Sequence, residues 1–254
     1  MKIFIDTANL REIEEACSWG IVDGLTTNPS LIRKAVQEKQ SEQFDIEQHI
    51  EQICRIVPGP VSLEVISLTA DAMVEEGTKL FARFNKLKGN VAIKIPVNTC
   101  DGGRNQDDFE GLIAIRRLAA QQIPVNATLI MTPEQALLAA KAGARYVSPF
   151  MGRIDDFRAA QDVQASSQPQ LPTGSEIVTQ IARVFANYGV DTEIIAASIR
   201  NVHHVRAAAL AGAQIATIPF AVLNAMSSHP KTEEGIRRFS ADVVPEYSGL
   251  LGLL

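Results

Sequence analysis

The sequence has few of the features that mark metal-binding, disulfide-stabilised, nucleic-acid-binding or membrane proteins. Its three cysteines, Cys17, Cys54 and Cys100, form no CxxC pair, so neither a disulfide framework nor a zinc site is predicted. Lys+Arg total 24 against 29 Asp+Glu, and the resulting net charge of −5 disfavours nucleic acid as a partner. The longest apolar stretch, residues 205–223, is broken by Pro219 and polar residues, and the first residues lack the core of a signal peptide. We therefore expect a cytoplasmic protein that does not enter a membrane.

Short apolar runs alternate with longer amphipathic stretches along the whole chain. Eight runs are typical of strands buried on both faces: residues 2–6, 24–27, 61–66, 91–95, 125–129, 146–148, 193–197 and 215–218. Helical patterns lie between them, among them residues 70–86, 109–121, 133–142, 175–188 and 202–211. Eight strand–helix units favour a closed barrel over a doubly wound sheet, whose first turn is usually glycine-rich. The sequence predicts an α/β protein with one domain, a (β/α)8 TIM barrel spanning residues 1–254.

Two segments interrupt this alternation. Residues 162–174 are rich in glutamine, serine and proline and have no apolar period, which predicts a mobile loop inserted into the barrel. Residues 242–254 contain Pro245 and end in Gly-Leu-Leu-Gly-Leu-Leu. Four leucines exposed to water would be unfavourable, so we expect this C-terminal tail to pack against another surface.

Polar side chains interrupt several of the predicted buried strands. Lys94 lies between two isoleucines, and burying an ammonium group costs several kcal/mol, so such a lysine tends to lose its proton. Asp6, Glu64, Asn126 and Thr128 are polar residues in three further apolar runs. Because side chains alternate across a strand, Asn126 and Thr128 share a face. We expect these five groups to converge at the C-terminal mouth of the barrel; a buried salt bridge that only fills the barrel is the structural alternative.

Four more polar residues follow predicted strands. Asn28 comes directly before Pro29, where the simplest role of an asparagine is to cap a helix. Arg153, Ser198 and Arg200 follow two late strands. Each arginine alone would more often be a solvated loop charge, but two arginines and a hydroxyl beside a helix N-terminus suit a phosphate group.

Signatures of other enzyme classes are missing from the sequence. There is no P-loop, GxGxxG, GxSxG or HExxH motif to indicate a nucleotide site, a serine hydrolase or a zinc protease. His203 and His204 are adjacent, so on a helix they point in different directions and do not form a metal-binding pair. We therefore expect no metal and no cofactor.

These residue types suit imine chemistry. A neutral lysine in an apolar barrel can attack a ketone and form an imine that serves as an electron sink. Cleavage of the neighbouring carbon–carbon bond then needs a base, for which Asp6 is the candidate. Glu64 and Thr128, with a water molecule, are candidates to move the protons of dehydration, and Arg153 and Arg200 would hold the phosphate of a sugar. The residues thus predict a Schiff-base aldol enzyme.

Seven segments then match a known family in order along nearly the whole chain. They are residues 4–8 (FIDTA), 26–30 (TTNPS), 64–67 (EVIS), 93–96 (IKIP), 126–129 (NATL), 148–153 (SPFMGR) and 196–200 (AASIR). With these segments the chain resembles the transaldolase family, in particular its compact transaldolases and fructose-6-phosphate aldolases. The resemblance implies that Lys94 on the fourth strand forms the imine with a ketose phosphate and that Asp6 is the acid–base residue at the cleaved bond.

The same resemblance implies further roles. Glu64 and Thr128 would hold the catalytic water. The dihydroxyacetone part of the substrate would bind Asn28, Asn126 and Ser148, and the phosphate would bind Arg153, Ser198 and Arg200. Members of this group commonly form rings in which the last helix crosses a neighbour, so a homo-oligomer, a pentamer or decamer, is implied.

Two positions distinguish the subgroups of this family. The aldolases tend to have glutamine and tyrosine where this chain has Glu64 and Phe150. A carboxylate and an apolar ring would leave the enamine waiting for an acceptor aldehyde, whereas a phenol could help to protonate it. We therefore expect a transaldolase of the pentose phosphate pathway. Fructose-6-phosphate aldolase activity and a non-catalytic sugar-phosphate-binding barrel are the alternatives.

Overall fold

The computed structural model describes residues 1–38, 44–100, 109–162, 171–250 and 252, and it forms a closed parallel β-barrel. The barrel strands are β1 (Lys2–Asp6), β2 (Gly24–Thr26), β3 (Val61–Glu64), β4 (Val91–Pro96), β5 (Val125–Ile130), β6 (Tyr146–Pro149), β7 (Glu193–Ala196) and β8 (Ile215–Ile218). Neighbours in sequence pair in order, and β8 closes the ring by pairing with β1, for example at Lys2 and Ile215. The predicted barrel is confirmed, with strand ends within two residues of those expected.

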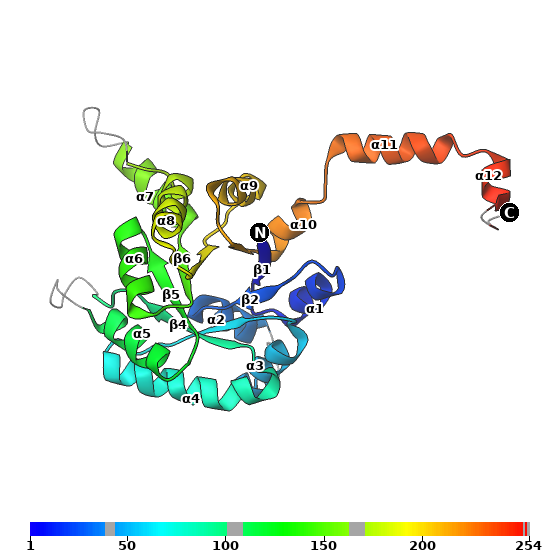
Figure 1. The fold of residues 1–254 in the computed structure, drawn as a ribbon. Helices are drawn as coiled ribbons and strands as arrows, with labels where there is room; N and C mark the ends of the chain where they lie inside the picture. The colour runs from blue at the N-terminus through cyan, green and yellow to red at the C-terminus, as the bar shows by residue number, and fades with distance from the viewer. Residues whose placement is uncertain (39–43, 101–108, 163–170, 251, 253–254) are drawn as a thin grey trace.

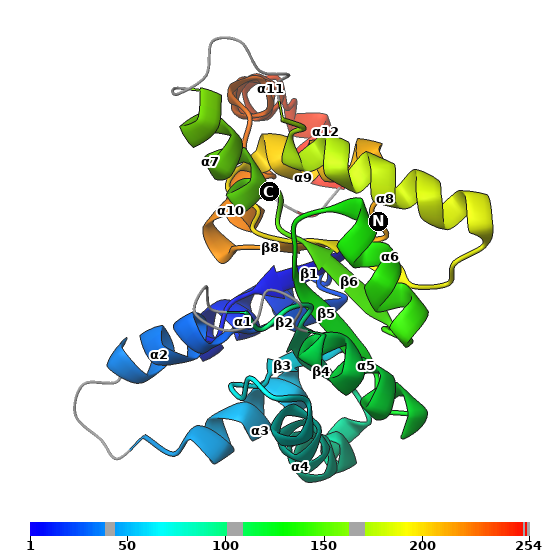
Figure 2. The same cartoon turned by 90° about the vertical axis from the view of Figure 1, so that its left-hand side faces the viewer.

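Most of the helices surround the barrel, and the last two extend away from it (Figures 1 and 2). Those before β5 are α1 (Leu10–Ser18), α2 (Pro29–Glu38), α3 (Ile46–Ile56), α4 (Ala70–Lys88) and α5 (Glu110–Ala120). Those after β5 are α6 (Pro133–Ala142), α7 (Met151–Asp162), α8 (Gly174–Tyr188), α9 (Val202–Ala211), α10 (Phe220–Ala225), α11 (Pro230–Ala241) and α12 (Pro245–Leu250). None of the helices in the described part of the chain is long and apolar enough to cross a membrane.

Helix ends follow the local sequence. Gly143, Gly189 and Gly212 end α6, α8 and α9 with φ angles of 101°, 60° and 90°, the left-handed conformation that glycine adopts without steric cost. Thr132 and Thr173 begin α6 and α8, and each accepts a hydrogen bond from the third residue of its helix in a capping box.

An apolar cluster fills the barrel below the C-terminal ends of its strands, and the polar residues lie above this cluster. Five buried side chains from five strands form it: Phe4, Ala92, Tyr146, Ile195 and Ile215. Because side chains alternate, the residues two positions later on β1, β4 and β6 share its face. Those residues are Asp6, Lys94 and Ser148, which therefore lie on top of the cluster at the C-terminal mouth.

The two segments that interrupt the sequence pattern have different outcomes. Residues 163–170 of the predicted loop lie outside the described residues, and α8 begins at Gly174. The predicted tail contains α12, which follows α11 in an arm that extends away from the barrel (Figure 1). Neither helix of this arm has a buried residue.

Candidate functional site

Lys94 lies inside the barrel on β4 and is only 5% exposed. Strand register puts it beside Glu64 on β3, and its Nζ is 2.9 Å from the Glu64 Oε2 atom. Nζ also donates a hydrogen bond of 3.1 Å to the carbonyl oxygen of Thr27. Lys94 therefore has a carboxylate partner that is itself largely buried.

Asp6, at the end of β1, belongs to a chain of hydroxyl groups. Thr26 Oγ1 on β2 donates a hydrogen bond of 2.7 Å to Asp6 Oδ1 and lies 2.6 Å from Thr217 Oγ1 on β8. Since the Thr26 proton points to Asp6, Thr217 is the donor of the second bond. Burial raises the pKa of Asp6 above its ordinary value of 3.8, and the Thr26 hydrogen bond and the charge of Lys94 offset part of that rise.

Asn126 connects two further strands inside the barrel. Its Nδ2 donates to Ser62 Oγ at 3.1 Å, and its Oδ1 accepts from Ser148 Oγ at 2.7 Å. It pairs in register with Lys94, so the amide and the amine stand side by side at one level of the barrel. Thr128 is fully buried, and its hydroxyl has no hydrogen-bond partner among the residues that the structure describes.

A cavity of about 250 Å³ opens above this layer at the C-terminal ends of the strands. Its lining includes Asp6, Thr26, Asn28, Lys94, Ser148, Phe150, Arg153, Ser198, Arg200 and Thr217. Eight of the predicted site residues therefore share one cavity. Three others are not part of that lining. Glu64 contacts Lys94, Asn126 contacts Ser148, and Thr128 is fully buried.

Asn28 has the structural role that its position suggested. Its Oδ1 accepts a hydrogen bond of 3.0 Å from the backbone N–H of Leu31 in the first turn of α2. That bond uses only the carbonyl oxygen of the side chain, so both amide protons remain for a ligand in the cavity that Asn28 lines.

Two arginines line the cavity. Arg153 lies in the first turn of α7 with its guanidinium group 5.1 Å from the centre of the Phe150 ring. Arg200 follows Ser198, whose φ of +57° is unusual for a residue with a side chain. Gly152 allows this turn to approach α7, because a Cβ atom there would lie 2.3 Å from the Ser198 carbonyl oxygen.

Sequence reasoning missed some members of this layer. Thr217 and Ser62 are polar residues in buried strands, which is the same signal that singled out Asn126. No group of three or more His, Cys, Asp or Glu residues in the described part of the chain could hold a metal ion. The arrangement that is present, a buried amine beside a carboxylate with a second carboxyl group of raised pKa, suits imine formation and proton transfer.

The chain is similar to proteins of one family. The family model "Transaldolase/Fructose-6-phosphate aldolase" matches residues 3–247. A probable transaldolase of Clostridium perfringens is 49% identical over 242 residues, covering 95% of this chain and 97% of that protein. Probable transaldolases of Prosthecochloris aestuarii and Caldicellulosiruptor saccharolyticus are 46% and 49% identical over 243 residues, again covering 95% of this chain and 97% and 96% of theirs. This chain belongs to the transaldolase/fructose-6-phosphate aldolase family.

Proposed function

We propose that this protein is a transaldolase. It transfers a dihydroxyacetone unit from a ketose phosphate (fructose 6-phosphate or sedoheptulose 7-phosphate) to an aldose phosphate (erythrose 4-phosphate or glyceraldehyde 3-phosphate). The observation that carries the proposal is the buried Lys94 amine, 2.9 Å from Glu64 and in one cavity with Asp6. The names of the relatives, probable transaldolases, support it.

The reaction begins on Lys94. The Nζ lone pair adds to C2 of the ketose, and loss of water gives an imine. Nζ must be uncharged to attack, and Glu64 is the nearest carboxylate that can accept its proton. Asp6 then removes the proton of the C4 hydroxyl, the C3–C4 bond breaks, and its electrons pass to the imine to give an enamine.

Transfer completes the cycle. The aldose phosphate leaves, an acceptor aldehyde enters, and enamine carbon C3 attacks its carbonyl carbon. Asp6 returns its proton to the new hydroxyl, and water hydrolyses the imine to free Lys94. Asp6 is suited to both directions because its raised pKa lowers the cost of carrying a proton between the two steps.

Thr128 and Glu64 are proposed to hold the water molecule of dehydration and hydrolysis. The buried Thr128 hydroxyl, which has no hydrogen-bond partner in the described residues, supports this role, because a buried polar group is normally satisfied by protein or water. Glu64 can exchange protons with such a water while it contacts Lys94.

Binding groups divide between the two ends of the sugar. Asn28, Asn126 and Ser148 are proposed to hydrogen-bond the dihydroxyacetone part, which forms the imine at Lys94. Arg153, Ser198 and Arg200 are proposed to bind the phosphate. The support is that all three residues line the same cavity as Lys94, and charge-assisted bonds from arginine suit a phosphate.

The decisive test replaces the amine. Lys94→Met keeps the length of the side chain, and we expect no turnover and no mass change on borohydride treatment with fructose 6-phosphate. Lys141→Met, on the surface helix α6, is the matched control and should react like the wild type. Borohydride labelling of the Lys94→Met variant at the wild-type level would refute the imine at Lys94.

Transfer is distinguished from simple cleavage by omitting the acceptor. We expect fructose 6-phosphate to be consumed rapidly only when erythrose 4-phosphate is present, because Phe150 offers no phenol to protonate the enamine. Equal consumption without acceptor would identify a fructose-6-phosphate aldolase instead. Absence of reaction with any sugar phosphate, with binding retained, would identify a non-catalytic barrel.

The protein is also proposed to assemble with copies of itself, as a pentamer or decamer. The arm formed by α11 and α12 supports this, since Phe239 is 74% and Leu250 79% exposed. Ile236, Val243, Val244 and Tyr247 add further exposed apolar side chains to the same arm. Such a surface is unfavourable in water unless a partner covers it. A monomeric mass by light scattering at micromolar concentration would refute the assembly. The cytoplasmic location stays a prediction.

A further inference from the structure

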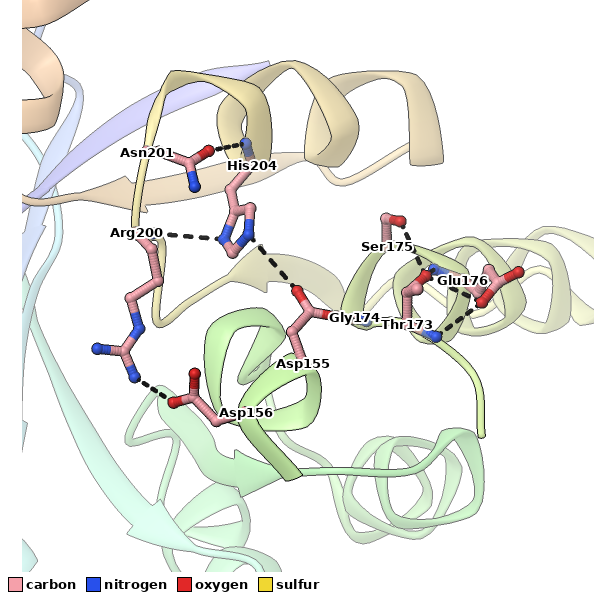
Figure 3. Close-up of polar contacts among 9 residues, drawn as sticks. All are labelled: Asp155, Asp156, Thr173, Gly174, Ser175, Glu176, Arg200, Asn201 and His204. Carbon is pink, nitrogen blue, oxygen red and sulfur yellow. Dashed lines mark hydrogen bonds and ion pairs between the residues drawn. The ribbon is translucent and has the colours of Figure 1, made fainter. Parts of the chain in front are cut away.

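Three segments of the chain meet around His204 and Asp155 (Figure 3), next to Arg200, which lines the cavity. They are the first half of α7, the start of α8 at Gly174, and the turn of residues 198–201 that leads into α9. His204 on α9 and Asp155 on α7 lie between these segments and connect them.

The His204 ring contacts both of its neighbours through nitrogen atoms. Its Nδ1 accepts a hydrogen bond of 3.4 Å from the backbone N–H of Arg200, so Nδ1 carries no proton. The proton of the neutral ring is then on Nε2, which faces Asp155 Oδ2 at 3.5 Å. The backbone N–H of His204 in turn donates to Asn201 Oδ1 at 3.0 Å, which fixes the start of α9.

Asp155 is held from its other side. Its Oδ1 accepts a hydrogen bond of 2.8 Å from the backbone N–H of Gly174. Gly174 is pressed against α7, since a Cβ atom there would lie 2.5 Å from the backbone of Met151. Asp155 is thus tied to the start of α8, while its other oxygen, Oδ2, faces His204 Nε2 at 3.5 Å.

The turn of residues 198–201, which His204 contacts, contains an unfavourable backbone conformation. Ser198 has the positive φ described above, a conformation that costs energy for a residue with a side chain. The carbonyl oxygen of Ser198 accepts from Gly152 N–H at 3.1 Å, which fixes the first half of the turn. The contact from Arg200 N–H to His204 fixes the second half.

Arg200 also forms an ion pair with Asp156, but this pair is exposed to water. Asp156 lies 2.8 Å from the Arg200 guanidinium group, but the two side chains are 67% and 53% exposed. Ion pairs this exposed contribute little, because water screens the charges and two long side chains must be ordered. The backbone contact to His204 is better shielded from water, because the His204 side chain is only 19% exposed.

We propose that His204 and Asp155 are positioning residues for the phosphate site: they fix the backbone of Arg200 so that Ser198 and Arg200 face the phosphate. Neither residue lines the cavity, so both act through Arg200. The inference rests on the proposed function, in which Arg200 binds the phosphate of the sugar. It gives His204 a role, whereas the sequence showed only that His203 and His204 do not form a metal-binding pair.

The test measures phosphate recognition apart from imine formation. Borohydride trapping on Lys94 gives a half-saturation concentration for fructose 6-phosphate and one for dihydroxyacetone, which has no phosphate. We expect His204→Leu to raise the ratio of the first to the second about tenfold, equivalent to about 1.4 kcal/mol. His204→Asn, whose carbonyl oxygen can still accept from Arg200 N–H, should recover most of the wild-type ratio. His203→Leu, on the exposed side of α9, is the matched control.

The outcomes separate this inference from the proposed function. If Arg200→Ala raises the ratio and His204→Leu does not, the positioning role is refuted and the phosphate site stands. If Arg200→Ala leaves the ratio unchanged, both are refuted. An equal rise in both half-saturation concentrations in His204→Leu, not recovered by asparagine, would mean that the residue is merely structural. Asp155→Asn keeps an acceptor for Gly174 N–H and should raise the ratio several-fold; it decides the question if the leucine variant does not fold.

Discussion

Replacing Thr26 with valine removes the hydrogen bond that stabilises the ionised form of Asp6. Valine has nearly the same shape, so the barrel wall is preserved while the donor at 2.7 Å is lost. Burial already raises the pKa of Asp6, and the Thr26 bond opposes that rise. Its removal therefore raises the pKa further, and Asp6 takes up its proton at a higher pH than in the wild type.

The size of the effect follows from the bond that is lost. A hydrogen bond to a charged group contributes about 1.5–3 kcal/mol, and 1.36 kcal/mol corresponds to a tenfold change in a protonation equilibrium. On the acid side of the pH–rate profile, kcat of Thr26→Val should therefore fall below the wild-type value by roughly tenfold or more. At alkaline pH, where Asp6 is ionised in both proteins, the two rates should converge.

The assay follows transfer from fructose 6-phosphate to erythrose 4-phosphate across the pH range, alongside borohydride trapping with dihydroxyacetone. Trapping needs no bond cleavage, so its pH profile should not follow Asp6. Thr217→Val is the matched control, because it removes the hydroxyl behind Thr26 and leaves the Thr26–Asp6 bond in place. Two results would refute the assignment of Asp6 as the base. One is a pH–kcat profile of Thr26→Val that matches the wild type on the acid side. The other is a pH profile of borohydride trapping that shifts as much as the profile of transfer.

Three other substitutions probe the same layer. Phe150→Tyr places a phenol near Lys94, whose Nζ is 6.0 Å from the ring centre, and should raise acceptor-independent cleavage several-fold, measured as released dihydroxyacetone. Asp6→Asn should abolish cleavage yet raise the melting temperature at pH 8, because it removes a desolvated charge; the gain should shrink as the pH falls and wild-type Asp6 becomes neutral. In Gly152→Ala the new Cβ atom would clash with the Ser198 carbonyl oxygen. The ratio of the half-saturation concentrations for borohydride trapping, fructose 6-phosphate over dihydroxyacetone, should therefore rise tenfold or more. An unchanged ratio would contradict the close approach of this turn to α7.

The barrel could be predicted because its signals are local. Each strand is a short apolar run, and each helix ends at a residue, such as Gly143 or Gly212, whose conformation is determined within one turn. The positions of Lys94, Asp6 and Asn126 could be predicted for the same reason, since a polar residue in a strand buried on both faces is visible in one dimension.

The partnerships between those residues could not be predicted, because they depend on strand register. The contact between Lys94 and Glu64 requires β3 and β4 to align at that level, and the hydrogen bond from Thr217 to Thr26 joins strands at opposite ends of the sequence. The support of Arg200 by His204 is less visible still. Two adjacent histidines at the start of a helix carry no signal that distinguishes the ring facing Asp155 from the exposed one.

The polar layer is better explained by chemistry than by stability. Phe4 and Tyr146 lie two positions before Asp6 and Ser148 on the same strands, and their buried rings fill the barrel below the polar layer. The barrel interior therefore accepts apolar side chains. A buried ion pair such as Lys94–Glu64 is often no more stable than apolar residues of similar volume, because desolvation offsets the attraction of the charges. Folding alone would therefore favour a second apolar layer at the mouth. The paired groups, together with a buried Thr128 hydroxyl that has no partner in the described chain, are expected where a reaction needs polar groups.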